Sequence, residues 1–224
     1  LFRSTDILSN EGYWLNRRFF SAHHKKRPYI AVKFAQSVNG YMARKDGKPH
    51  WFSGQESKVL VHRWRNEEDA ILVGAGTLLK DNPQLNNRLW PGSSPQIVVI
   101  DRDGDLVNMR NAQVWKAEKP VLVFTTNKGL EWKNARVIHC AKKSFLMNVF
   151  NLLWQDFSLQ SVLVEGGPHL LKSLLEEDLW DEARVLTAPN PLKEGIAAPY
   201  FKGDILEVSA IGQDEYTLIK NTRS

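Results

Sequence analysis

The stretch VLVEGGPHLLKSLL (162–175) joins a strand-like apolar run to an apolar helix. Its opening Val and Leu residues are continuous rather than alternating with polar ones, which is typical of a strand covered on both faces. Gly166 and Gly167 fit a tight strand-to-helix turn, and Pro168 suits the first turn of a helix. Small residues do not account for Glu165. The stretch therefore predicts a strand–helix unit that presents a carboxylate at the carboxyl end of its strand.

Apolar runs of strand length recur along the chain, and helix-like segments separate several of them. The strand-like runs are 29–36, 69–74, 95–101, 120–126, 136–140 and 161–165. Helices are expected from a capping box at 53–56 to about Asn66, over AGTLLKD (75–81), and over LMNVFNLLW (146–154) after a Ser144 cap. DILEVSAIG and DEYTLIK flank a polar turn at Gln213 and read as a hairpin. This order predicts a three-layer α/β fold, with a mostly parallel sheet and an antiparallel C-terminal hairpin.

The N-terminal segment is expected to be an addition to this fold. Residues 11–22 (EGYWLNRRFFSA) are too apolar for a free tail, so they read as a docked helix or the last element of a neighbouring domain. The basic run HHKKR (23–27) is interpreted as a solvated linker in preference to a phosphate-binding tail. Because the chain begins with Leu1, we expect a processed protein or a piece of a longer one.

The composition describes a globular protein of 224 residues, with 42% hydrophobic and 25% charged residues. Its apolar runs fall short of the roughly 20 residues that a membrane helix needs, so no membrane partner is expected. Cys140 is the single cysteine. It cannot form an internal disulfide, which favours a cytoplasmic location. It also reads as a residue that fills the hydrophobic core. The net charge of +5 suits nucleic acid as a partner, or a substrate and cofactor that carry phosphates.

Several kinds of chemistry lack their motifs. One cysteine cannot build the zinc site of a nucleobase deaminase, and no metal site is expected. A G-x-S-x-G nucleophile turn and the dinucleotide-binding G-x-G-x-x-G are also absent from the sequence. The remaining prediction is positioning chemistry, in which the protein holds a cofactor against a substrate.

Polar residues at the predicted strand ends point to a phosphorylated ligand. Taken alone, Arg65, Asp81 and Arg88 each read as members of surface ion pairs; together with Glu165 they favour a sugar-phosphate site. A lone helical histidine such as His62, on the same helix as Arg65, is more often packed or exposed than catalytic. Arg102 directly follows a strand, where an arginine can neutralise the 2′-phosphate of a phosphorylated nicotinamide cofactor.

Four motifs, in order, resemble a known family. They are RPYIAVKFAQSVNGYMA (27–43), WFSG (51–54), HRWRNEEDAILVGAGTLLKDNPQLNNR (62–88) and VLVEGGPHLL (162–171). Together they resemble the reductase domain of the bifunctional riboflavin-biosynthesis deaminase/reductase, from about Arg27 to the C-terminus. The resemblance implies a dihydrofolate-reductase-like fold, a homodimer, and NADPH-dependent reduction of the ribosyl group of 5-amino-6-(5-phosphoribosylamino)uracil to ribityl. It also implies that residues 1–26 are the junction from a fused deaminase domain and that residues 27–224 are the reductase domain.

The resemblance also implies site residues. Cofactor contacts fall on Ala35, Trp51, Thr77, Asp81, Arg102, Gly167, Pro168, His169, Leu170, Leu171, Lys172 and Ser173. Substrate contacts fall on Pro49, Arg65, Leu85, Arg88 and Glu165. Lys33, Asp81 and Glu165 are the candidates for catalysis; Lys33 also reads equally well as a structural ion pair. Two positions depart from the family pattern: Pro49 stands where many members have serine, and Arg102 stands where a small polar residue is common.

Two other functions stay open on the sequence alone. A dihydrofolate- or pterin-type reductase would share the fold, although two arginines placed for a sugar phosphate argue against it. A basic module that binds single-stranded RNA through HHKKR and exposed tryptophans belongs to a different class. It would bind RNA with a strong dependence on salt.

Overall fold

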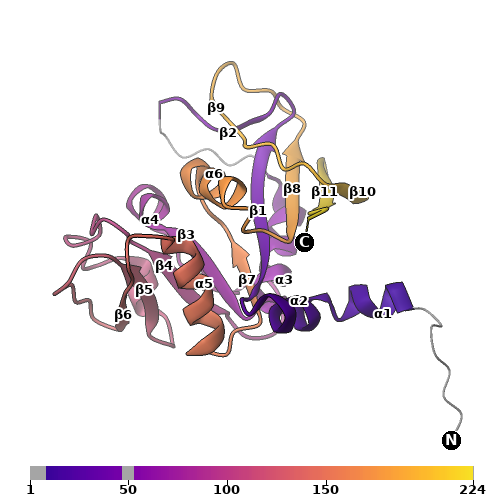
Figure 1. The fold of residues 1–224 in the computed structure, drawn as a ribbon. Coiled ribbons are helices and arrows are strands. Elements are labelled where there is room, and N and C mark those ends of the chain that lie inside the picture. The colour runs from indigo at the N-terminus through magenta and orange to yellow at the C-terminus, as the bar shows by residue number, and fades with distance from the viewer. Residues whose placement is uncertain (1–8, 47–52, 224) are drawn as a thin grey trace, which may run out of the picture.

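The computed structural model describes residues 9–46 and 53–223, and a nine-stranded sheet forms its centre (Figure 1). The spatial order is β10-β11-β8-β1-β7-β3-β4-β5-β6. All strands from β8 to β6 run parallel, whereas β11 is antiparallel to β8 and β10 to β11. The strands are β1 (Tyr29–Ser37), β3 (Ala70–Gly74), β4 (Gln96–Ile100), β5 (Val121–Thr125), β6 (Ala135–His139), β7 (Ser161–Val164), β8 (Glu182–Ala188), β10 (Asp204–Ile211) and β11 (Asp214–Lys220).

Helices cover both faces of this sheet, which completes the predicted three layers. The helices are α1 (Ser9–Leu15), α2 (Arg17–Lys25), α3 (Gln55–Glu67), α4 (Ala75–Asp81), α5 (Phe145–Gln155) and α6 (Pro168–Glu176), with a 3-10 turn η1 (Gln113–Lys116). On one face lie α5 and α6 (Figure 1), and their residues Phe150 and Leu171 belong to the same buried cluster as Val32 and Val164. On the other face, α3 covers β1 and β7 with Trp64, and α4 and η1 cover the sheet further along. The fold prediction is confirmed.

A small second sheet pairs β2 (Tyr41–Ala43) with β9 (Ile196–Ala197). In Figure 1 it lies beyond the carboxyl ends of β1 and β8, at the opposite end of the sheet from α2. Across the described ranges, none of the helices has both the length and the apolar character that crossing a membrane requires. Cys140 is buried in the main core, as predicted.

Strand β8 was not predicted from the sequence, although it lies in the middle of the sheet between β1 and β11. Its sequence EARVLTA carries Glu182 and Arg184 at alternating positions, and such charges are unusual in a strand buried on both faces. The Arg184 guanidinium donates from Nε to Glu182 at 2.7 Å and from Nη2 to Glu68 of α3 at 2.6 Å. These buried ion pairs let a charged segment occupy the core.

Two expected helix caps are wrong. Helix α3 starts after Gly54, and no side chain of the predicted capping box at 53–56 caps it. Instead, the carboxylate of Asp214, from the start of β11, accepts hydrogen bonds from the Gly54 N–H at 2.8 Å and the Ser57 hydroxyl at 2.6 Å. Ser144 does precede α5, but it adopts a left-handed conformation with φ of 52° and makes no side-chain cap. At the start of α3, the predicted capping box is therefore replaced by Asp214, an acceptor that the tertiary fold brings there.

The N-terminal segment forms two helices, with a break at Asn16, instead of the single helix expected over 11–22. The solvated-linker interpretation of HHKKR holds for the exposed His23, His24 and Lys26 but is wrong for Lys25 and Arg27. Arg27 is buried and donates to Asp181 at 2.6 Å, and Lys25 pairs with the same carboxylate. Because buried charges need partners, these contacts fix the end of α2 against the start of β8.

A second group of ion pairs ties α2 to the sheet. Arg18 donates to both carboxylate oxygens of Glu68, at 2.7 and 2.6 Å, and Arg17 donates to Glu182 at 3.1 Å. Both carboxylates are fully buried, and Arg184 lies between them. Helix α2 thus supplies countercharges to two glutamates inside the domain.

Candidate active site

Glu165 stands at the carboxyl end of β7, and Arg65 from the last turn of α3 grips it. The Glu165 backbone N–H bonds to the Leu72 carbonyl at 3.0 Å, which fixes the residue beside β3. Arg65 donates from Nε and Nη2 to the two oxygens of Glu165 at 2.7 and 2.8 Å, and from Nη1 to the Asn86 carbonyl at 3.0 Å. The pairing is bidentate, so both side chains are held in one geometry. The sequence brought these two residues to one site but did not predict that they bind each other.

The charged neighbours of Glu165 determine its ionisation state. Burial alone would raise the pKa of Glu165, but the charge and hydrogen bonds of Arg65, with a contribution from Lys33, lower it to about 2. The carboxylate is therefore ionised at neutral pH. It can accept hydrogen bonds from a ligand, but it holds no proton to donate.

Lys33 of β1 lies beside Glu165. The register pairs Val32 with Val164, so the next residues along, Lys33 and Glu165, are neighbours that face α3. Burial lowers the pKa of Lys33 and so does the charge of Arg65, while Glu165 raises it. Within the described residues, the Lys33 ammonium has no hydrogen-bond or ion-pair partner. The arrangement suits a group that gives up a proton more readily than a surface lysine.

His62 supports the candidate site indirectly, through the backbone of Arg88. It is buried, and its Nδ1 accepts a hydrogen bond from the Arg88 backbone N–H at 3.1 Å. Burial, and then the charges of Arg65 and Arg88, lower the pKa of His62 to about 4, so the imidazole is neutral at pH 7. His62 is thus packed, which is one of the two non-catalytic states expected for it. His62 fixes the segment that carries Arg88, whose exposed guanidinium bonds the Asn86 side chain at 3.0 Å.

Leu85 and Asp81 flank this segment. Leu85 is 2% exposed and packs in the core, yet its φ is 57°, which is unusual for a leucine. Any ligand contact there would be made by the backbone. Asp81, at the end of α4, is exposed; the pKa of its carboxyl group is raised, because the effect of partial burial exceeds that of the nearby Lys80 charge. The strained backbone holds a short loop between the two predicted ligand regions.

The predicted cofactor contacts gather where α4 and α6 begin. A Cβ on Gly167 would lie 3.9 Å from the Thr77 hydroxyl oxygen, so these two residues face each other. Leu170 covers Gly166, where a Cβ would approach its Cδ2 to 2.8 Å, and it also reaches Gly74 at 4.0 Å. The glycines therefore have two separate roles: Gly166 admits Leu170, and Gly167 leaves the first turn of α6 open beside Thr77.

The other predicted cofactor residues are placed differently from one another. Leu171 is fully buried in the core, whereas His169 and Lys172 are exposed, and Lys172 pairs with Glu176 at 3.6 Å. The Ser173 hydroxyl donates to the His169 carbonyl at 3.1 Å. Pro168 occupies the first turn of α6, and Ala35 lies two residues beyond Lys33 on the same face of β1. Trp51 and Pro49 lie outside the described residues.

Arg102 stands further along the same edge of the sheet, just after β4. Its guanidinium pairs with the neighbouring Asp103 at 3.0 Å, and both side chains are more than half exposed. Sequence reasoning missed Asp103, although its position next to Arg102 was visible. It also missed Asn86, which no sequence signal marks because Arg65 bonds its backbone carbonyl.

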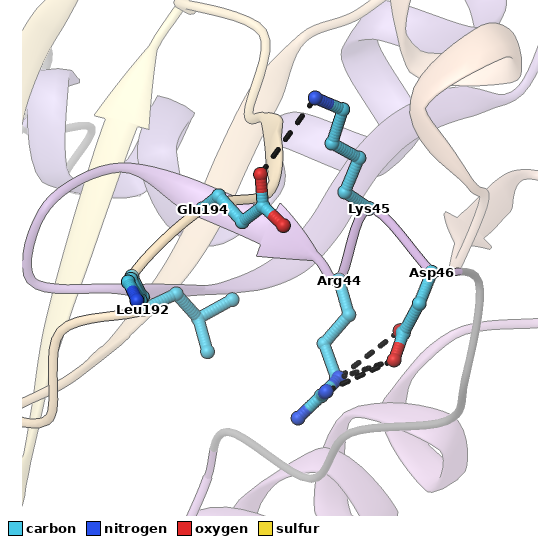
Figure 2. Close-up of a pocket in the computed structure, with 6 residues that line it drawn as sticks. Arg44, Lys45, Asp46, Leu192 and Glu194 are labelled. Carbon is cyan, nitrogen blue, oxygen red and sulfur yellow. Dashed lines mark hydrogen bonds and ion pairs between the residues drawn. The ribbon is translucent and has the colours of Figure 1, made fainter.

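A separate hollow of about 200 Å³ lies beside the β2–β9 ribbon. Figure 2 shows Lys45 facing Glu194 across it and Arg44 turned onto Asp46; the Lys45 Nζ–Glu194 Oε2 distance is 3.6 Å and the Arg44 Nη2–Asp46 Oδ2 distance is 2.9 Å. Its lining consists of Arg44, Lys45, Asp46, Leu192, Lys193 and Glu194. These residues include none of the predicted contacts, and most of their charges are paired. The hollow is therefore not the candidate site.

A mostly parallel sheet with an antiparallel terminal hairpin, and polar residues at the strand ends, defines an α/β domain of the dihydrofolate-reductase-like class. In agreement, the fold matches a dihydrofolate reductase from Enterococcus faecalis with a TM-score of 0.50 over 87% of this chain and 96% of that one, at 12% identity. Residues 28–205 match the model of the RibD C-terminal domain. The chain belongs to the RibD C-terminal domain family.

Two close relatives extend this result. The riboflavin biosynthesis protein RibD of Aquifex aeolicus is 34% identical over 196 residues, which cover 85% of this chain and 54% of the relative. The crystal structure of a diaminohydroxyphosphoribosylaminopyrimidine deaminase/5-amino-6-(5-phosphoribosylamino)uracil reductase from Thermotoga maritima matches with a TM-score of 0.86 and 28% identity, over 96% of this chain and 62% of that one. The chain thus spans about half the length of the curated relative it matches.

Proposed function

We propose that this chain catalyses the NADPH-dependent reduction of the ribosyl group of 5-amino-6-(5-phosphoribosylamino)uracil to the ribityl group, a step of riboflavin biosynthesis. The observation that carries the proposal is the cluster of Lys33, Arg65 and Glu165 at the carboxyl edge of the sheet. The family match and the names of the relatives support a reductase of riboflavin biosynthesis.

The residues present fit a nicotinamide dinucleotide. The first turn of α6 is open at Gly167, beside the Thr77 hydroxyl, and offers N–H groups to a pyrophosphate. Arg102 follows β4, which lies two strands from β7, and we assign it to the adenosine end of such a cofactor. When bound, NADPH supplies the hydride.

The substrate would be held by charge and hydrogen bonds. Arg88 carries an exposed guanidinium on a segment that His62 fixes, so it grips the phosphate; Arg65 has part of its donor edge left after binding Glu165. Glu165, ionised and held by Arg65, accepts hydrogen bonds from the pyrimidine or the ribose. Arg88 and Arg65 would then act as hydrogen-bond donors to the substrate, and Glu165 as a hydrogen-bond acceptor.

We assign to Lys33 the donation of the proton that the reduction requires. Reduction of the open imine form adds a hydride to the first carbon of the sugar and a proton to the attached nitrogen. Glu165 is ionised and Asp81 is exposed, whereas Lys33 is partly buried and has a lowered pKa. The ammonium of Lys33 gives a proton to the nitrogen and recovers one from water.

The proposal extends to the domain organisation, the oligomeric state and the location of the chain. We place residues 27–224 as the reductase domain and residues 1–26 as the junction from a fused deaminase domain, in a cytoplasmic homodimer. The RNA-binding alternative loses support, because Lys25 and Arg27 of its basic run are bound to Asp181. Arg88, which we assign to the substrate phosphate, also favours the sugar-phosphate substrate over a folate or pterin.

The activity is tested by mixing the purified chain with NADPH and the ribosylaminouracil phosphate and following absorbance at 340 nm. The proposal requires substrate-dependent NADPH oxidation and a ribityl product. Oxidation with dihydrofolate in place of this substrate would contradict it. Light scattering on the same sample tests the dimer.

A further inference from the structure

Arg102 and Asp103 form a pair of opposite charges at the carboxyl end of β4. Arg102 donates from Nε to the Asp103 oxygens at 3.4 and 3.2 Å and from Nη2 at 3.0 Å. The exposed fractions of the two side chains are 54% and 56%, so both face solvent. The guanidinium is therefore occupied by a carboxylate on the same loop.

The loop beneath the pair is rigid. The buried carboxylate of Asp101 accepts the backbone N–H groups of Asp105 at 2.8 Å and Leu106 at 3.2 Å. The Arg102 carbonyl accepts the Thr126 N–H at 3.0 Å and the Thr126 hydroxyl at 2.8 Å. These bonds fix the backbone of residues 101–106 while the two charged side chains stay free to turn. The position of the pair at the sheet edge is thus set, but its charge pattern can adapt to a ligand.

The two side chains favour opposite forms of a nicotinamide dinucleotide. An arginine just beyond a strand end suits the 2′-phosphate of NADPH, whereas a carboxylate there accepts a hydrogen bond from the ribose 2′-hydroxyl of NADH. A strand end that carries only one of these groups would discriminate strongly. This strand end carries both, in contact with each other.

We propose that Asp103 is a specificity-determining residue that weakens the preference for NADPH and lets the chain bind NADH as well. The inference rests on the proposed function, because it needs the dinucleotide to lie along the carboxyl edge of the sheet. An exposed ion pair is worth little, so the Arg102 guanidinium can turn to a phosphate at small cost. The Asp103 carboxylate remains nearby, repels the phosphate, and serves the 2′-hydroxyl when no phosphate is present.

The test is a fluorescence titration of the full chain with NADPH and with NADH, for the natural protein and for Asp103→Asn. We expect the natural chain to bind both, with an affinity ratio below about tenfold. Asp103→Asn should raise that ratio about fivefold, mainly by tighter binding of NADPH, because one repulsive charge is gone. Circular dichroism checks that the variant is folded.

Asp105→Asn is the matched control. It removes the same charge from the same loop, but the exposed Asp105 side chain does not contact Arg102. Its ratio should stay within about twofold of the natural chain. An unchanged ratio in Asp103→Asn, or an equal rise in Asp105→Asn, overturns the role of Asp103 while leaving the proposed function intact. A natural chain that binds neither dinucleotide overturns both.

Discussion

Arg65 and Glu165 come from elements a hundred residues apart and meet as a bidentate ion pair, with Nε–Oε1 and Nη2–Oε2 distances of 2.7 and 2.8 Å. The pair joins the end of α3 to the end of β7 and keeps Glu165 ionised, with a pKa of about 2. Lys33 lies beside it on β1. In the proposed mechanism this arrangement separates two tasks: Glu165 would accept hydrogen bonds from the substrate, and Lys33 would donate the proton.

Replacement of Lys33 tests that division. Lys33→Met should lower kcat about 100-fold, because the proton donor is lost, and should leave the dissociation constant of NADPH within about twofold. In the natural enzyme, the rate should fall as pH rises through the lowered pKa of Lys33, and Lys33→Met should lose this limb. Stopped-flow rates across pH measure both. A variant that keeps most of its kcat rules out the proton role.

Arg88 is expected to bind the substrate phosphate. Arg88→Ala should raise KM for the phosphorylated substrate about tenfold, because a charged hydrogen bond is lost, with little change in KM for NADPH. Arg63→Ala is the control, since Arg63 is an exposed arginine of α3 that pairs with Glu67. Steady-state kinetics give both constants. Equal effects on the two ligands would refute the phosphate role.

Arg102 is expected to prefer the phosphorylated cofactor. Arg102→Ser should bring the affinities for NADPH and NADH to within about twofold of each other, because the cation that faces the 2′-phosphate is gone. The exposed Arg110 in the following turn offers a control with the same change of charge, Arg110→Ser. Titration with both dinucleotides measures the ratio, and a ratio unaffected by Arg102→Ser would remove Arg102 from the cofactor site.

Gly166 is expected to be required for packing. A Cβ there would lie 2.8 Å from Cδ2 and 3.1 Å from Cβ and Cγ of Leu170, so Gly166→Ala must push that side chain. We expect a loss of about 1–3 kcal/mol and a fall in Tm of a few degrees. Gly76→Ala should not lower Tm, because nothing lies within 4 Å of its added Cβ. Calorimetry compares the two, and equal melting temperatures would contradict the packing role.

Glu68 should make the stability depend on acid pH. Burial would raise its pKa, but the charges and hydrogen bonds of Arg184 and Arg18 lower it from 4.5 to about 2. A lowered folded-state pKa means that the stabilisation is complete above pH 4.5 and is lost as pH falls towards 2. Glu68→Gln should cost about 3 kcal/mol at neutral pH and flatten this acid limb. Urea unfolding at several pH values measures the slope; an unchanged slope in the variant would contradict the assignment.

The apolar runs were enough to predict most of the sheet. Continuous Val, Ile and Leu around Leu72 and Leu163 are typical of strands covered on both faces, and the glycine turns indicate where helices follow. Strand β8 was not predicted, because the charged residues Glu182 and Arg184 are not expected in a buried strand. Their burial depends on Glu68 and Arg17, which are distant in the chain.

The sequence by itself determined the α/β class, the order of most elements and the family, because hydrophobic periodicity and motif order are local properties. It also placed Glu165 at a strand end. Only the tertiary structure decided that Arg65 binds Glu165, that Asp214 caps α3, and that α2 neutralises buried carboxylates. Charged groups are held by whichever partner the fold brings near them. The free energy of burying a charge depends on that partner, and no local pattern records it.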